Sequence, residues 1–166
     1  MVTKNIQKAA DMGKEVAIFG GSFNPVHLGH LIIAECCLEQ AHLDRVLFMP
    51  AAIPPHKQNS PLAGCEDRAQ MLRLALAGHD RLELSLDECN RGGVSYTVDT
   101  VNDLVARHPN DHFSLILGPD ALADLPSWKK PQELLSTIRI LAIERHGIDD
   151  IENLSLIHIS EPTRLV

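Results

Sequence analysis

The chain lacks the sequence features of nucleic-acid-binding, membrane and secreted proteins. Its 166 residues carry a net charge of −7, and aromatic residues make up only 4% of the composition. Nucleic acids and anionic membranes are bound through clustered Lys and Arg, so this acidic balance argues against both as main partners. No apolar run approaches the length of a membrane span, and residues 1–14 lack the apolar core of a signal peptide. We therefore expect a cytoplasmic protein.

Cysteine is also sparse and irregularly spaced. Cys36 and Cys37 are adjacent, Cys65 and Cys89 are isolated, and no Cys-x-x-Cys spacing occurs. Such a pattern predicts neither a zinc site nor a disulfide framework. We expect all four cysteines to be reduced packing residues.

Two common phosphate-binding motifs are absent, namely Gly-x-Gly-x-x-Gly and Gly-x-x-x-x-Gly-Lys-Ser/Thr. Their absence disfavours a redox protein that binds NAD as a cofactor. Instead, the apolar run at residues 16–19 is followed by residues 20–30, GGSFNPVHLGH. Paired glycines let a phosphate approach the backbone, and a following helix presents free N–H groups and its positive dipole end. This segment predicts a nucleotide-phosphate site.

Two histidines in this segment are spaced for one helix face. Residues three apart on a helix are neighbours, so His27 and His30 can offer N–H donors to the same phosphate oxygens. A lone histidine is more often a surface or core residue. A metal site would need a third ligand, and residues 31–34 offer none. We therefore expect phosphate binding and no metal held by the protein.

The remaining sequence alternates between strand and helix patterns. This order predicts one α/β domain with a Rossmann-like parallel sheet and helices on both faces. Ligands bind such sheets at the carboxyl ends of the strands. The expected strands are residues 16–19, 45–49, 82–86, 113–117 and 138–143, and the expected helices are residues 26–40, 66–77 and 97–107, with an unassigned region at 122–135.

Loops that contain charged residues or histidine follow several of these strands. They include PPHK at residues 54–57, GPD at 118–120 and ERHG at 144–147. Lys57 is either a solvated surface charge or a phosphate ligand. Trp128, the only tryptophan, is either a core residue or a surface on which a flat ring stacks.

Four motifs together resemble the bacterial nicotinate-nucleotide adenylyltransferases. These are the His-x-Gly-His motif in residues 20–30, PPHK at 54–57, SYTVDT at 95–100 and LGPDALADLPSW at 117–128. The resemblance covers residues 15–147. The first motif alone identifies only the nucleotidyltransferase superfamily, and would equally suggest phosphopantetheine adenylyltransferase or a cytidylyltransferase.

The resemblance implies a reaction of NAD biosynthesis, in which ATP and nicotinate mononucleotide give deamido-NAD and pyrophosphate. It implies Mg²⁺ carried mainly by the ATP phosphates, and it leaves a homo-oligomer open. His27 and His30 would be catalytic as electrostatic stabilisers. The implied ATP-binding residues are Gly20, Gly21, Ser22, Phe23, His27, His30, Gly118, Asp120 and Arg145. The implied substrate-binding residues are Lys57, Ser95, Tyr96, Thr97, Asp120 and Trp128, with Lys57 near either the mononucleotide phosphate or the triphosphate.

The C-terminal part departs from the family pattern. Family members carry an Ile-Ser-Ser-Thr-x-Ile-Arg motif, whereas residues 159–164 read ISEPTR, with Pro162 inside the motif and Arg164 one position early. His146 stands where the family has Pro. We expect a C-terminally incomplete nucleotidyltransferase domain over residues 1–153 and a tail outside the family at 154–166. A catalytically impaired nucleotide-binding remnant is therefore the alternative.

Overall fold

The computed structural model describes residues 13–145 and 154–159, which build one six-stranded sheet. The strand order is β3-β2-β1-β4-β5-β6, with β1 to β5 mutually parallel and β6 antiparallel to β5. The predicted parallel α/β sheet is thus confirmed. The boundary at residue 153 stays a prediction. The strands are β1 (Glu15–Gly21), β2 (Arg45–Pro50), β3 (Leu82–Leu84), β4 (His112–Leu117), β5 (Arg139–Arg145) and β6 (Leu154–Ile159).

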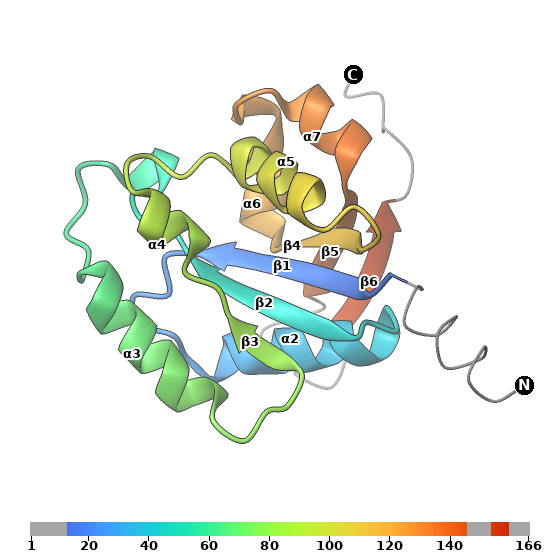
Figure 1. The fold of residues 1–166 in the computed structure, drawn as a ribbon, viewed down its shortest axis with the longest axis horizontal. Coiled ribbons are helices and arrows are strands. Elements are labelled where there is room, and N and C mark those ends of the chain that lie inside the picture. Colours follow the sequence, from blue (N-terminus) through green and yellow to red (C-terminus); the bar gives the residue numbers. More distant parts are fainter. Residues whose placement is uncertain (1–12, 146–153, 160–166) are drawn as a thin grey trace, which may run out of the picture.

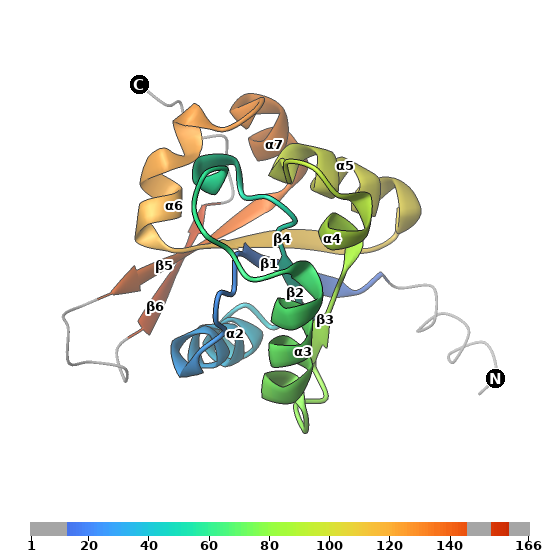
Figure 2. The ribbon, with the colours of Figure 1, turned by 90° about the vertical axis from the view of Figure 1, so that its left-hand side faces the viewer.

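Helices cover both faces of this sheet, as expected (Figure 1). In Figure 2, α2 and α3 lie below the sheet, and α5, α6 and α7 lie above it. The helices are α2 (Leu28–Gln40), α3 (Cys65–Leu76), α4 (Asp87–Arg91), α5 (Thr97–Arg107), α6 (Pro119–Asp124) and α7 (Pro131–Thr137), with short 3-10 helices η1 (Pro55–Lys57) and η2 (Leu125–Ser127).

The central strands are buried on both faces, so they form two separate core layers. Ala17 and Phe19 of β1 pack with the apolar side chains of α2 and α3. Val16 and Ile18 of the same strand pack with those of α5 and α7. This alternation follows from the two-residue period of a strand. It explains why these strands are continuous apolar runs in the sequence.

Most expected elements differ from their predicted limits by one or two residues, as the helix at 26–40 and the strand at 82–86 illustrate. The helix predicted from residue 26 begins at Leu28, because His27 is extended (φ −144°) and is its N-cap. The strand predicted over 82–86 ends at Leu84, and α4 follows at Asp87. This five-residue helix was not predicted, because it is too short for a helical period to show in the sequence.

The prediction of four reduced cysteines is wrong for one pair. Cys65, the first residue of α3, and Cys89 in α4 form a disulfide with their Cα atoms 5.9 Å apart. Cys36 and Cys37 are free, as expected. Residue spacing could not reveal the pair, because 24 positions separate the two cysteines and only the fold brings α3 and α4 together.

Two leucines of α3 test this packing. Leu72 is fully buried, whereas Leu74 on the same helix is 71% exposed. We expect Leu72→Ala to lower the free energy of unfolding by about 2–5 kcal/mol, because it removes transfer energy and leaves a cavity. Leu74→Ala should change it by less than about 0.5 kcal/mol. Urea unfolding of both variants measures this, and equal losses would contradict the assignment of the core.

Candidate nucleotide site

A cavity of about 930 Å³ lies at the carboxyl edge of the sheet, beyond the ends of β1 and β4. Its walls come from three segments: the turn between β1 and α2, the loop from η1 to α3, and the start of α6. The lining residues are Gly21, Ser22, Phe23, Asn24, Pro25, His27, His30, Lys57, Ser60, Pro61, Leu62, Gly118, Pro119, Asp120 and Ala121.

Most of the predicted ATP-binding residues line this cavity, but three need comment. Gly20 does not line the cavity. The space beside its Cα is open, because a Cβ placed there would meet no atom within 4 Å. Phe23 is 3% exposed and its ring packs on Phe19 and Phe48, so any ligand contact goes through its backbone. Arg145 ends β5, and its side chain lies outside the described part of the chain.

The N-terminus of α2 presents the histidine pair to the cavity. His27 is the N-cap and His30 is the third residue of the helix. Their rings stack with centroids 3.7 Å apart and planes 28° apart. A Cβ on Gly29 would lie 3.0 Å from Cε1 and Nδ1 of His27, so a larger residue would push that ring away. The first turn of α2 carries no acidic residue, which leaves its dipole free for an anion.

The tautomer of His30 follows from one hydrogen bond. The backbone N–H of His27 donates to Nδ1 of His30 at 3.1 Å. In the neutral ring the proton is therefore on Nε2, where it can serve as a donor. Burial, and secondarily the charge of His27, lowers the pKa of His30 to about 4. At neutral pH His30 is consequently an uncharged N–H donor.

Two further contacts hold the cavity walls together. Nζ of Lys57 donates to Oγ of Ser22 at 3.2 Å, so Lys57 belongs to the same cavity as the histidines. The backbone N–H of Ala63 donates to Oδ1 of Asn24 at 3.2 Å. Asn24 lies within the predicted motif but had no predicted role. Residues 60–62 also line the cavity, and nothing in their sequence signals this.

A second, smaller cavity of about 110 Å³ contains three predicted substrate-binding residues, Tyr96, Thr97 and Trp128. Trp128 packs partly against the core, and its buried Nε1–H has no hydrogen-bond partner among the residues that the structure describes. Lys129 lies over the ring of Tyr96 at 4.6 Å from its centroid. The other lining residues are Pro55, His56, Val98, Ser127 and Lys129.

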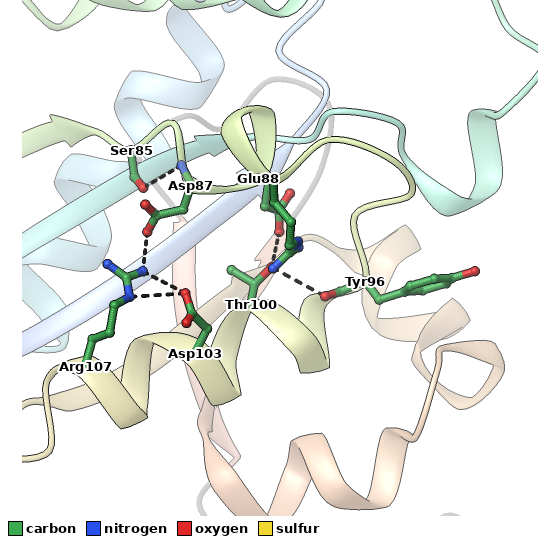
Figure 3. A network of polar contacts seen from close by, with 8 residues as sticks. Ser85, Asp87, Glu88, Tyr96, Thr100, Asp103 and Arg107 are labelled. Atoms are coloured by element: carbon green, nitrogen blue, oxygen red, sulfur yellow. Dashed lines mark hydrogen bonds and ion pairs between the residues drawn. The ribbon is translucent and has the colours of Figure 1, made fainter.

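Ser95 lines neither cavity and instead supports the loop before Tyr96. It is 4% exposed, and its hydroxyl accepts the backbone N–H of Ala52 at 2.9 Å. The buried carboxyl of Glu88 accepts hydrogen bonds from Ser95 and Thr100, the latter at 2.7 Å. Burial raises the pKa of Glu88 despite these bonds. Figure 3 shows the hydrogen bond between Thr100 and Glu88, with the ring of Tyr96 pointing away from it.

The two cavities are adjacent because one short helix lines both. Within η1, Lys57 lines the larger cavity, while Pro55 and His56 line the smaller one. Nε2 of His56 lies 2.9 Å from Oδ2 of Asp124, which fastens η1 to the end of α6. A ligand with two parts could therefore occupy both spaces at once.

Over residues 13–145 and 154–159, no group of three His, Cys, Asp or Glu side chains is arranged to hold a metal ion. Asp120 is the one carboxylate among the residues that line the larger cavity. None of the helices in the same described ranges has both the length and the apolar character to span a bilayer.

The fold and the site define a class: an α/β protein with a large cavity at the switch point of its sheet, beside a helix N-terminus that carries two histidines. The chain matches the cytidylyltransferase-like family over residues 18–164. It is 46% identical over 134 residues to the nicotinate-nucleotide adenylyltransferase of Bacillus subtilis, a match that covers 81% of this chain and 71% of that one. The chain therefore belongs to the cytidylyltransferase-like family and, within it, to the nicotinate-nucleotide adenylyltransferases.

Two further comparisons agree. A Geobacillus thermodenitrificans protein named "Probable nicotinate-nucleotide adenylyltransferase" is 45% identical over 136 residues, 82% of this chain. The chain spans 62% of the length of that relative. The solved structure of the Plasmodium falciparum nicotinic acid mononucleotide adenylyltransferase complexed with NaAD has the same fold, with a TM-score of 0.68 at 21% identity, covering 82% of this chain and 68% of that one.

The lowered pKa of His30 can be measured by titration. We expect the ring of His30 to titrate near pH 4 and, when neutral, to carry its proton on Nε2. Long-range ¹H–¹⁵N NMR measures both properties, and the His30→Gln variant assigns the signal. Because the folded-state pKa lies below the ordinary 6.5, the unfolded state takes up this proton first as the pH falls. His30 therefore lowers the free energy of unfolding between about pH 6.5 and pH 4, and lowers it no further below pH 4. A midpoint near 6.5 would contradict the burial of the ring.

Proposed function

We propose that this protein transfers the adenylyl group of ATP to the 5′-phosphate of nicotinate mononucleotide, giving deamido-NAD and pyrophosphate. The observation that carries the proposal is the pair of adjacent cavities. The larger one holds the histidine pair, Lys57 and a helix N-terminus, which suit a triphosphate. The smaller one holds an aromatic ring with an unpaired N–H, which suits a flat polar ring.

The nucleophile in this reaction needs no general base. A phosphate monoester has a second pKa of about 6 and is already largely a dianion at neutral pH. One of its oxygens forms a bond to the α-phosphorus of ATP as the bond from that phosphorus to the pyrophosphate oxygen breaks. The protein must therefore align the two substrates and stabilise the charge that builds on the α-phosphate and the leaving group.

The residues of the larger cavity suit this task. The Nε2–H of His30 can donate a hydrogen bond without carrying a charge, because the pKa of this ring is lowered to about 4. The α2 N-terminus adds partial positive charge, and Lys57 adds a full one. In this proposal Lys57 faces the triphosphate, since its Nζ already contacts Ser22 beside the histidine pair.

Mg²⁺ would be carried mainly by the ATP phosphates and water. This ion typically uses one or two carboxylates together with substrate phosphates. Asp120, in the first turn of α6, supplies one carboxylate at the cavity wall, so the residues present fit such an ion. The bound ion would neutralise charge on the phosphates.

At the other end of the site, the pyridine ring would stack on Trp128 near Tyr96 and Thr97. In this proposal nicotinate is favoured over nicotinamide because the curated relatives are nicotinate-nucleotide adenylyltransferases.

The assay that tests this function is pyrophosphate release from ATP with Mg²⁺. We expect release with nicotinate mononucleotide and much slower release with nicotinamide mononucleotide or phosphopantetheine. Fast release with phosphopantetheine would assign the chain to another reaction. No release with any of the three, from protein whose circular dichroism shows it folded, would contradict the proposed activity.

His30 should contribute strongly to turnover. We expect His30→Ala to lower kcat by about two to three orders of magnitude, as removal of one transition-state hydrogen-bond donor does. The control is His108→Ala, at an exposed position following α5 on the opposite edge of the sheet. Unchanged turnover in His30→Ala would show that His30 is not a stabiliser of the transition state.

A further inference from the structure

Arg68 of α3 is a buried cation that the proposed reaction does not use directly. It is 1% exposed, although Arg is seldom fully buried unless paired with an acid. Within the part of the chain that the structure describes, no carboxylate forms an ion pair with it. Its positive charge is therefore compensated only by dipoles.

Those dipoles belong to three different segments. Nε of Arg68 donates to the carbonyl of Ala63 at 2.8 Å, and one terminal nitrogen donates to the carbonyl of Ser22 at 2.8 Å. The other terminal nitrogen donates to the carbonyl of Ala52 at 3.4 Å and lies 3.3 Å from Sγ of Cys65. The planar fork of Arg suits such a divergent set of acceptors, and a Lys ammonium does not reproduce it.

Each bonded segment leads to a wall of the phosphate cavity. Ser22 lies in the turn before the histidine pair and lines the cavity. Ala52 precedes η1, which carries Lys57. Ala63 follows residues 60–62, which line the cavity, and its N–H bonds to Asn24. The guanidinium is thus the one group that bonds to all three segments among the contacts of the described residues.

The charge of Arg68, which faces backbone dipoles and no carboxylate among the described residues, bears on ligand binding. Burial lowers the pKa of Arg68, in keeping with a cation that is removed from water without an acidic partner. Yet an Arg side chain stays protonated at neutral pH. A polyphosphate in the cavity would bring negative charge close to the cation, in surroundings that screen the attraction weakly.

We propose that Arg68 is a positioning residue for the triphosphate. It holds the turn at Ser22 and the segment between Ala52 and Ala63, which form two of the three cavity walls, and its buried charge favours an anion in the cavity without touching it. This inference rests on the proposed function, because it takes the larger cavity to be the triphosphate site. It adds a group that lies outside the sequence motifs.

The test is the affinity of inorganic tripolyphosphate for the full chain, measured by titration calorimetry. Arg68→Met keeps an apolar stem but removes the charge and the fork, and we expect it to weaken binding by about tenfold, because a positive charge behind the cavity wall no longer attracts the anion. Arg68→Lys keeps the charge and should recover part of this loss. Arg73→Met, an exposed arginine on the same helix, is the matched control and should bind like the unmodified protein.

The outcomes separate the two proposals. If the unmodified protein does not bind tripolyphosphate, the proposed nucleotide site is wrong and the role of Arg68 falls with it. If it binds and a folded Arg68→Met binds within threefold of it, only the role of Arg68 is overturned. A purely structural role would lower the unfolding temperature of Arg68→Met and leave this affinity unchanged.

A measurement on the unmodified protein covers the case in which Arg68→Met does not fold. The Nε–H of Arg68 is buried and bonded to Ala63, so it should give a slowly exchanging ¹H–¹⁵N signal. We expect tripolyphosphate to shift this signal with the same concentration dependence as binding. A signal that stays in place at saturation would overturn the inference.

Discussion

The parallel pairing of β1 with both β2 and β4 is the constraint on which the rest of this site depends. The strand order 3-2-1-4-5 reverses its direction of growth between β1 and β4. The chain therefore leaves β1 toward α2 on one face and leaves β4 toward α6 on the other. A crevice must open where these two connections diverge. Residues 21–30 and 118–121 form opposite walls of the larger cavity for this reason.

Local charge in this crevice opposes the charge of the whole chain. The net charge is −7, yet the cavity receives a helix N-terminus, the ammonium of Lys57 and, behind its walls, the guanidinium of Arg68. Among the described residues, Asp120 is the one acidic side chain that lines it. An anionic ligand is therefore attracted only at close range, where dipoles and buried charges dominate. This arrangement suits a small nucleotide better than an extended polyanion.

The sequence predicted the fold and the meeting of the two histidines because both depend on local patterns. Alternation of buried strands and amphipathic helices defined the layers, and the spacing of His27 and His30 around Gly29 placed two rings at one helix N-terminus. The helical-face argument itself was not correct in detail, since His27 precedes the helix. An N-cap residue and the third helical residue nevertheless share one side of the first turn, so the rings still meet.

Contacts that depend on tertiary packing could not be predicted in the same way. The Cys65–Cys89 disulfide and the burial of Arg68 both require α3 to lie against segments far away in the sequence. In the sequence Arg68 resembles any charged residue on a helix. Ser95 shows the reverse case: its motif suggested contact with substrate, but its hydroxyl is used by Ala52 and Glu88. A motif residue can thus hold the loop that carries the binding residues.

The geometry of His30 also restricts the chemistry that the site can perform. A ring whose Nδ1 accepts a backbone N–H and whose pKa is lowered to about 4 is neutral near pH 7, and its Nε2–H is too weak an acid to transfer a proton. It is a weak base as well, because few molecules are protonated at equilibrium. What it retains is a fixed N–H dipole, and such a dipole stabilises negative charge without needing to reorganise. Attack of a phosphate dianion on a triphosphate requires this kind of stabilisation of negative charge. It does not require acid or base catalysis, because no proton has to move in the bond-making step.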